Sequence, residues 1–189
     1  MTPAERHMRA DARRNYALLL AAARDAFTEH GPEATLDDIA KRAVLGPGTL
    51  YRHFPNREAL LAAVYIGDVE ALAAQADELS RTHQPWEALT AWMSLLADYT
   101  KHKRGGLGVA VKSMLGADSD TLAACRDMLQ GALGRLVEQA QQAGVVRPDV
   151  NVMDVLKLVH AVGIASESAP EHADRLLSLV LDGLRPQQR

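Results

Sequence analysis

The chain has 189 residues, of which 48% are hydrophobic and only 4% aromatic, and its net charge is −3. This length provides one moderate domain or two small ones, and abundant alanine and leucine favour helices over strands. The single cysteine, Cys125, excludes an intramolecular disulfide and suits a reducing cytoplasm. No apolar run approaches the roughly 20 residues of a membrane span, and nothing near the first residues resembles a secretory signal.

A first helix is predicted over residues 13–30, after a polar lead-in over residues 2–11. Gly31-Pro32 ends this helix. Its buried stripe consists of Tyr16, Leu19, Leu20, Ala23 and Phe27. The lead-in carries Arg6, His7 and Arg9, and Arg13 and Arg14 follow directly. It is interpreted either as a disordered tail or as a basic arm that contacts phosphate or enters a minor groove.

A helix, a tight turn and a short second helix are predicted over residues 35–57. Thr35 can cap the first helix, because its hydroxyl accepts a bond from a free backbone N–H. Gly46 is the expected cap of the second helix, and Pro47 occupies its first position, where a missing N–H costs nothing. Leu50 and Phe54 face the first helix, so the remaining side chains form a different surface. Their small, hydroxylic, aromatic and cationic types are those that contact DNA when a helix enters a major groove.

The run GTLYRHFPNREALL at residues 48–61, with TLDDIA before it, resembles the TetR family of bacterial transcriptional regulators. The resemblance is close over about residues 16–65. It implies an all-α fold of about nine helices, with a helix-turn-helix DNA-binding domain at 1–65 and a helical effector-binding and dimerisation domain at 66–189. The predicted DNA-contacting residues are Arg13, Arg14, Thr35, Pro47, Gly48, Thr49, Tyr51, Arg52, His53 and Arg57.

One turn residue departs from the family pattern. Val44 stands where the family usually has glycine, and a β-branched residue in a left-handed turn is strained by about 1–2 kcal/mol. Either Val44 carries this strain, or the turn has an ordinary backbone and Val44 packs between Ala40 and Leu50. We expect the strained turn.

A long helix is predicted to follow, from its cap at Asn56 to about residue 80. Arg57 lies at the positive end of this helix, where charge–dipole terms disfavour a cation, so a nearby phosphate would explain its placement. The alternative is an arginine solvated at the surface. The N-terminal part of this helix is expected to pack against the first domain and its C-terminal part against the second. The boundary between the two domains is therefore expected inside the helix, near residues 65–67.

Five more helices are predicted, at about residues 86–101, 107–115, 118–143, 151–166 and 170–184. The basic run at 101–106 is interpreted as a solvated loop in preference to a phosphate site. Residues 98–105 also resemble the SbtR-like subgroup of C-terminal domains.

The resemblance implies a small-molecule pocket among the middle helices and a dimer interface on the last two. The pocket candidates combine apolar surface with a few polar atoms, and core packing is the alternative for each of them: Trp92, Met93, Leu96, Tyr99, Met114, Cys125, Met128 and His160. The interface candidates lie on helices with more apolar content than one stripe: Val152, Val155, Val159, Gly163, Leu177, Val180, Leu181 and Leu184.

Catalysis is not expected. The seven histidines show no metal-binding spacing, and no phosphate-binding loop or nucleophile elbow is present. No cofactor or metal is predicted. The sequence predicts a cytoplasmic homodimeric repressor that binds a palindromic operator and is released by an unknown effector. An architectural DNA-binding protein, or an activator without a ligand, is the alternative.

Overall fold

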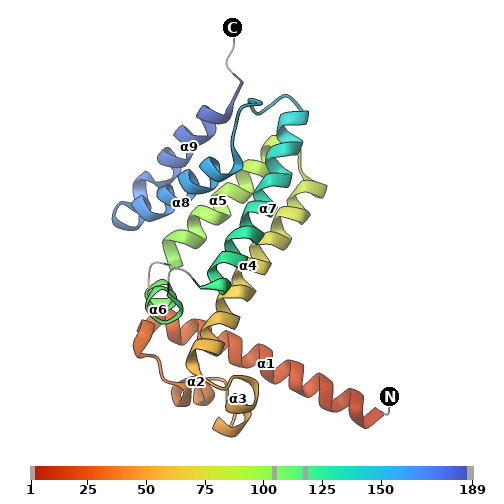
Figure 1. Cartoon of the computed structure of the whole chain (residues 1–189), viewed down its shortest axis with the longest axis vertical. Helices are drawn as coiled ribbons and strands as arrows, with labels where there is room; N and C mark the ends of the chain where they lie inside the picture. The colour runs from red at the N-terminus through yellow and green to blue at the C-terminus, as the bar shows by residue number, and fades with distance from the viewer. Residues whose placement is uncertain (1–2, 104–105, 117–118, 187–189) are drawn as a thin grey trace. The chain divides into compact units, whose positions relative to one another are not determined.

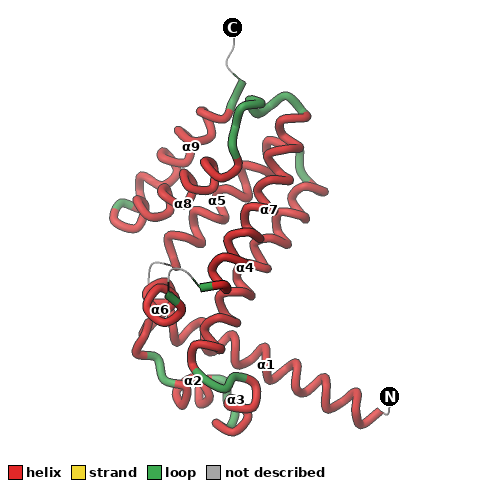
Figure 2. Tube along the Cα trace, viewed as in Figure 1, coloured by secondary structure: helices red, strands yellow, loops and turns green. Residues whose placement is uncertain are grey.

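The computed structural model describes residues 3–103, 106–116 and 119–186, which form nine α-helices, two short 3₁₀ helices and no strand (Figure 1, Figure 2). This confirms the all-α prediction. The elements are α1 (Pro3–His30), η1 (Gly31–Glu33), α2 (Leu36–Arg42), α3 (Pro47–His53), α4 (Arg57–Thr82), α5 (Pro85–Lys103), α6 (Gly106–Leu115), α7 (Asp120–Gln142), α8 (Val152–Ser168), η2 (Pro170–His172) and α9 (Ala173–Leu184).

The chain divides into two compact units, and α4 passes from one to the other. The first unit comprises Met1–Gly67 and Gly105–Thr121, and the second comprises Asp68–Arg104 and Leu122–Arg189. The division at Gly67 lies inside a helix, close to the boundary expected from the sequence. The second domain expected from the sequence, however, included residues 105–121. In the structure α6 packs against α1 and η1, so this segment belongs to the first unit.

The first unit is built on the apolar stripe of α1. Leu19, Ala23 and Phe27 are fully buried, as predicted, and Tyr16 keeps 39% of its surface exposed. Residues 3–11 continue α1 as regular helix, so the expectation of a disordered tail was wrong, while the alternative of a basic segment that contacts DNA stays a prediction (Figure 1). No proline follows Pro3 in this stretch, and alanine and arginine favour helix.

The second unit has a core formed by α4, α5, α7, α8 and α9. Trp92 and Met93 are fully buried in it. Helices α5 and α8 approach closely at Gly163, where an added Cβ would lie 2.6 Å from Thr100 Cβ and 2.7 Å from the Ala97 carbonyl oxygen. Only glycine permits this approach, because real Cβ contacts are never so short.

Helix α4 is long and apolar enough, by length and composition alone, to cross a membrane. A core helix meets the same criterion. Leu60, Leu61 and Val64 are fully buried near its start, and Leu72 and Ala76 belong to the core of the second unit. These buried residues account for part of the apolar character of α4.

Candidate nucleic-acid interface

The N-terminal end of α2 is capped as predicted. Thr35 has an extended backbone, and its hydroxyl oxygen accepts a hydrogen bond from the Asp38 backbone N–H at 3.1 Å. The same hydroxyl donates to the Asp38 carboxylate at 2.6 Å, which holds the pKa of Asp38 below its usual range. Asp37 and Asp38 also lie where the helix dipole favours negative charge. These contacts fix the point at which the helix-turn-helix begins.

The turn between α2 and α3 contains a strained valine. Val44 has a φ of 56°, which confirms the left-handed conformation expected from the sequence. The Leu45 N–H bonds to the Ala40 carbonyl and the Val44 N–H bonds to the Lys41 carbonyl, both at 3.0 Å, so α2 ends in a Schellman motif, which requires this conformation. The Val44 side chain is 89% exposed, so no packing compensates the strain.

Helix α3 presents one face to its own unit and another to solvent. Leu50 is fully buried and Phe54 is 4% exposed, as predicted. Pro47, Gly48, Tyr51 and Arg52 are exposed. A Cβ added at Gly48 would meet nothing within 4 Å, so the missing side chain leaves the helix backbone open to an incoming molecule.

The C-terminal end of α3 is held by aromatic contacts with α1. The Tyr16 ring lies 5.2 Å from the Phe54 ring and 5.9 Å from the His53 ring, between centroids. His53 is half-buried as a result, and so is Thr49 nearer the start of the helix. Of the predicted DNA-contacting residues of α3, these two are therefore partly covered by the protein itself.

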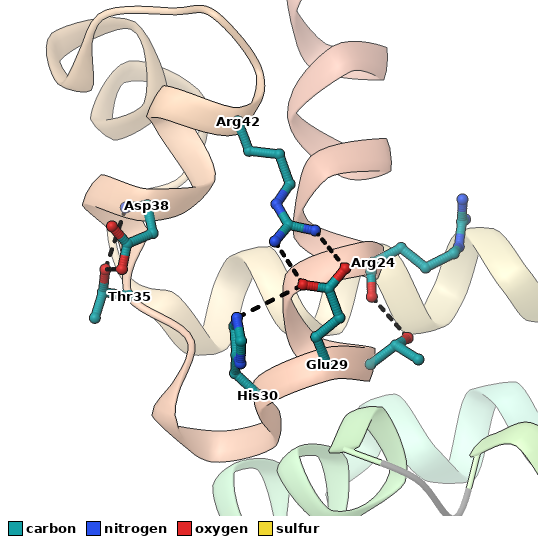
Figure 3. A network of polar contacts seen from close by, with 7 residues as sticks. Arg24, Glu29, His30, Thr35, Asp38 and Arg42 are labelled. Carbon is teal, nitrogen blue, oxygen red and sulfur yellow. Dashed lines mark hydrogen bonds and ion pairs between the residues drawn. The ribbon is translucent and has the colours of Figure 1, made fainter.

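A polar network that the sequence analysis did not predict joins α1 to α2 (Figure 3). Arg42 donates two hydrogen bonds to the Glu29 carboxylate, at 2.8 and 2.6 Å, and His30 lies 3.6 Å from the same carboxylate. The hydrogen bonds from Arg42 lower the pKa of Glu29. No sequence signal indicates this pair, because its members are 13 positions apart on different helices.

Arg57, at the start of α4, is oriented towards its own unit. Its guanidinium donates to the Pro32 carbonyl oxygen and lies 5.8 Å from the centre of the Phe27 ring. Arg57 is therefore half-buried and not a fully solvated arginine, and its predicted contact with DNA stays a prediction. Asn56 caps α4 as predicted, by accepting from the Ala59 N–H at 2.8 Å. Arg13 and Arg14 lie exposed on α1.

Two family models match this chain. One, described as bacterial regulatory proteins of the tetR family, matches residues 19–64. The other, described as the C-terminal domain of SbtR-like transcriptional regulators, matches residues 84–186. The second match covers more than half of the chain and includes most of the second unit.

This chain belongs to the TetR family of transcriptional regulators.

Individual relatives agree with this assignment. The TetR transcriptional regulator SCO0520 from Streptomyces coelicolor is 37% identical, with a TM-score of 0.79 and coverage of 92% of this chain and 99% of that one. The HTH-type transcriptional regulator UidR of Escherichia coli K12 is 28% identical over 162 residues, which cover 81% of this chain and 80% of UidR. The regulator FadR from Bacillus subtilis, solved with stearoyl-CoA, shares only the fold, with 16% identity, a TM-score of 0.69 and coverage of 90% and 100%.

As a TetR regulator the chain has a helix-turn-helix whose elements α2 and α3 the sequence predicted correctly. Its family consists of transcriptional regulators, which are in general not enzymes. The structure also shows where the residues predicted for an effector pocket and for a dimer interface lie.

The structure places the predicted pocket residues in different surroundings. Trp92, Met93, Leu96 and Cys125 are at most 2% exposed, and the Trp92 indole N–H donates to the Leu72 carbonyl at 2.8 Å. Tyr99 and Met128 are half-buried, His160 is exposed on α8, and Met114 belongs to the first unit. A shallow depression of about 410 Å³ lies over Asp127, Gln130, Gly131, Gly134 and Val152. The effector role of the predicted residues stays a prediction.

The predicted interface residues divide into two groups. Val155, Val159, Gly163, Leu177 and Leu184 are buried within the protomer. Val152, Val180 and Leu181 are half-buried on α8 and α9, and the interface role of all eight stays a prediction. Two leucines that we did not predict are more exposed on the same helices, Leu158 at 49% and Leu179 at 62%. The helical periodicity alone did not separate the outward positions from those that face the core.

Proposed function

We propose that this TetR regulator is a cytoplasmic homodimeric repressor that binds a palindromic operator through α3 and is released by a small-molecule effector. The solvent-exposed face of α3 carries this proposal: Pro47, Gly48, Tyr51 and Arg52 are exposed, while Leu50 on the opposite side is fully buried. Two copies would read half-sites at least one helical turn, ~34 Å, apart.

Each exposed group has a distinct task in this proposal. Tyr51 and Arg52 donate hydrogen bonds to phosphates and base edges, and Gly48 lets the backbone come close to the DNA. The exposed Arg13 and Arg14 on α1 contact phosphates, whereas Thr35 fixes the N-terminal end of α2 through its bonds with Asp38. Because the first 58 residues hold nine Lys and Arg against eight Asp and Glu, affinity depends on this local cluster and on dimerisation.

Footprinting on the intergenic DNA upstream of the encoding gene tests this proposal. We expect the wild-type protein to protect a palindrome. Arg52→Ala should weaken binding by roughly tenfold or more, as loss of one base contact does. Arg81→Ala, at the far end of α4, is the matched control and should bind normally. Equal affinity for all duplexes would indicate an architectural DNA-binding protein instead.

Release by an effector is supported by the fold shared with FadR, a protein solved with stearoyl-CoA. Adding metabolite fractions from cell extract to the protein–DNA complex tests it. Loss of the footprint with one fraction supports a ligand-responsive repressor. If no fraction changes the footprint, or if binding increases transcription from a reporter, the repressor mechanism is wrong.

A further inference from the structure

Arg57 lies where three segments of the first unit meet. It is the first residue of α4, its guanidinium Nη2 donates to the Pro32 carbonyl oxygen in η1, and its Cζ lies 5.8 Å from the centre of the Phe27 ring in α1. A guanidinium within about 6 Å of an aromatic ring centre is attracted by the electrons of the ring. One side chain therefore joins α1, η1 and α4.

Two of the three guanidinium nitrogens of Arg57 face its own unit. Its Nε is buried and has no hydrogen-bond partner among the residues that the structure describes. One terminal nitrogen is already bonded to Pro32. The guanidinium already contacts a carbonyl oxygen and an aromatic ring of its own unit, and these interactions compete with a phosphate for it. A lysine could not reproduce both contacts, because its ammonium is a compact charge without a planar fork.

The contact between Arg57 and Pro32 positions the beginning of α2. Pro32 lies three residues before Thr35, whose hydroxyl caps α2. Between them, the Ala34 N–H donates to the Gly31 carbonyl at 3.3 Å, which makes η1 and the cap one short, bonded segment. Helix α2 then packs directly on α3. A displacement of Pro32 is therefore transmitted through Thr35 to the helix-turn-helix.

We propose that Arg57 is a positioning residue, which holds η1 against the start of α4 and thereby fixes α2 and α3 for DNA binding, and that it does not bind phosphate. This inference rests on the DNA-binding function proposed above. It replaces the phosphate contact predicted from the sequence. The interactions of Arg57 with Pro32 and Phe27 then offset the unfavourable placement of a positive charge at the N-terminal end of α4.

The test uses the full-length variants Arg57→Lys and Arg57→Met with two DNA probes. One probe is a duplex selected by the wild-type protein from a random library, and the other is a random-sequence duplex. Affinity is measured by fluorescence anisotropy over a series of KCl concentrations, and amide hydrogen exchange is followed by mass spectrometry. Arg81→Lys is the matched control, because it makes the same change at an exposed arginine near the other end of α4.

For a positioning residue, both variants bind the selected duplex roughly tenfold more weakly, as when one or two base contacts are misplaced. The salt slope and the affinity for the random duplex stay at wild-type values. Amide exchange becomes faster over residues 31–38 and is unchanged in the second unit. If Arg57→Met does not fold, Arg57→Lys decides the question alone.

Two results would overturn the inference. In the first, Arg57→Lys retains affinity while Arg57→Met flattens the salt slope by about 0.9 for each lost contact on both duplexes, which indicates a phosphate contact. In the second, exchange at residues 31–38 accelerates without loss of affinity, which indicates a purely structural role. If the wild-type protein selects no duplex, the proposed function itself fails, so the two failures are distinguishable.

Discussion

At the scale of single residues, Val44 stores strain that nothing around it relieves. Its φ of 56° is imposed by the two hydrogen bonds that end α2, and its side chain is 89% exposed. A valine in this conformation costs about 1–2 kcal/mol, while glycine there costs roughly 0.5–1 kcal/mol in unfolded-chain entropy. We therefore expect Val44→Gly to stabilise the protein by about 0.5 kcal/mol, with similar or tighter DNA binding.

Thermal melts check this expectation. The control is Gly144→Ala, at a turn with a φ of +69° where a Cβ would meet nothing within 4 Å. That change introduces strain where none exists but reduces unfolded-chain entropy, so it should lower the melting temperature by the equivalent of about 0.5 kcal/mol. A lower melting temperature for Val44→Gly as well would show that the valine is not strained.

The Glu29–Arg42 pair predicts an acid-sensitive first unit. Arg42 holds the folded-state pKa of Glu29 below its ordinary value of 4.5, and Thr35 lowers that of Asp38 below 3.8. A lowered pKa contributes stability that is present above the unfolded-state value and is lost as pH falls through the folded-state value. Stability should therefore fall below about pH 4.5, and Glu29→Gln should flatten that part of the profile.

Urea unfolding over a pH series measures this effect. The control is Glu171→Gln, which removes an exposed carboxylate from η2 in the second unit. That variant should keep the wild-type profile. If Glu29→Gln keeps it too, the pair seen in Figure 3 does not contribute to folding stability.

At the scale of elements, α3 is a seven-residue helix that begins without a side-chain cap. Gly46 has the extended backbone of an N-cap, with φ −70° and ψ 147°, and a Cβ there would meet nothing within 4 Å. Gly46→Ser should add a hydroxyl bond to a free N–H and stabilise the protein by about 0.3–0.5 kcal/mol. The hydroxyl should also tighten DNA binding by contacting a phosphate.

Chemical unfolding and anisotropy titrations measure the two effects. Gly46→Ala is the control, because it adds the Cβ without the hydroxyl and should gain neither effect. If alanine and serine behave alike, the cap has no role at this position.

The sequence predicted the elements of the helix-turn-helix because their signals are local. Thr35 and Asn56 cap their helices by accepting from N–H groups three residues on, Gly46 and Pro47 begin α3 through their backbone preferences, and all four occupy the expected places. The pair formed by Glu29 and Arg42 and the inward orientation of Arg57 depend on packing between helices, which local spacing does not encode. The same limit applies to the outward leucines of α8 and α9, since each of these helices is apolar over more than one stripe.

At the scale of the whole molecule, the proposed dimer predicts at which exposed apolar residues a negative charge prevents dimerisation. Leu179 is 62% exposed in the protomer, so Leu179→Glu should leave helicity intact while it removes the dimer and specific DNA binding. Val180→Glu and Leu181→Glu should also disrupt the dimer. Light scattering and circular dichroism check both parts.

The control is Leu95→Glu, which introduces the same charge at a leucine that is 38% exposed on α5. It should remain a dimer and bind DNA. An unaltered dimer in all the α9 variants would show that the interface lies elsewhere.

The assignment of α6 to the first unit makes the DNA-binding half of this protein discontinuous along the chain. Leu107, Ala110 and Val111 of α6 are buried, and the helix packs on α1 and η1, yet it is synthesised after residues 68–104. During translation the first unit therefore stays incomplete until α6 has left the ribosome, a delay of several seconds at about 5–20 residues per second. A fragment that stops at Gly67 should likewise expose the surface that α6 covers and aggregate, unless a peptide of residues 105–121 is supplied.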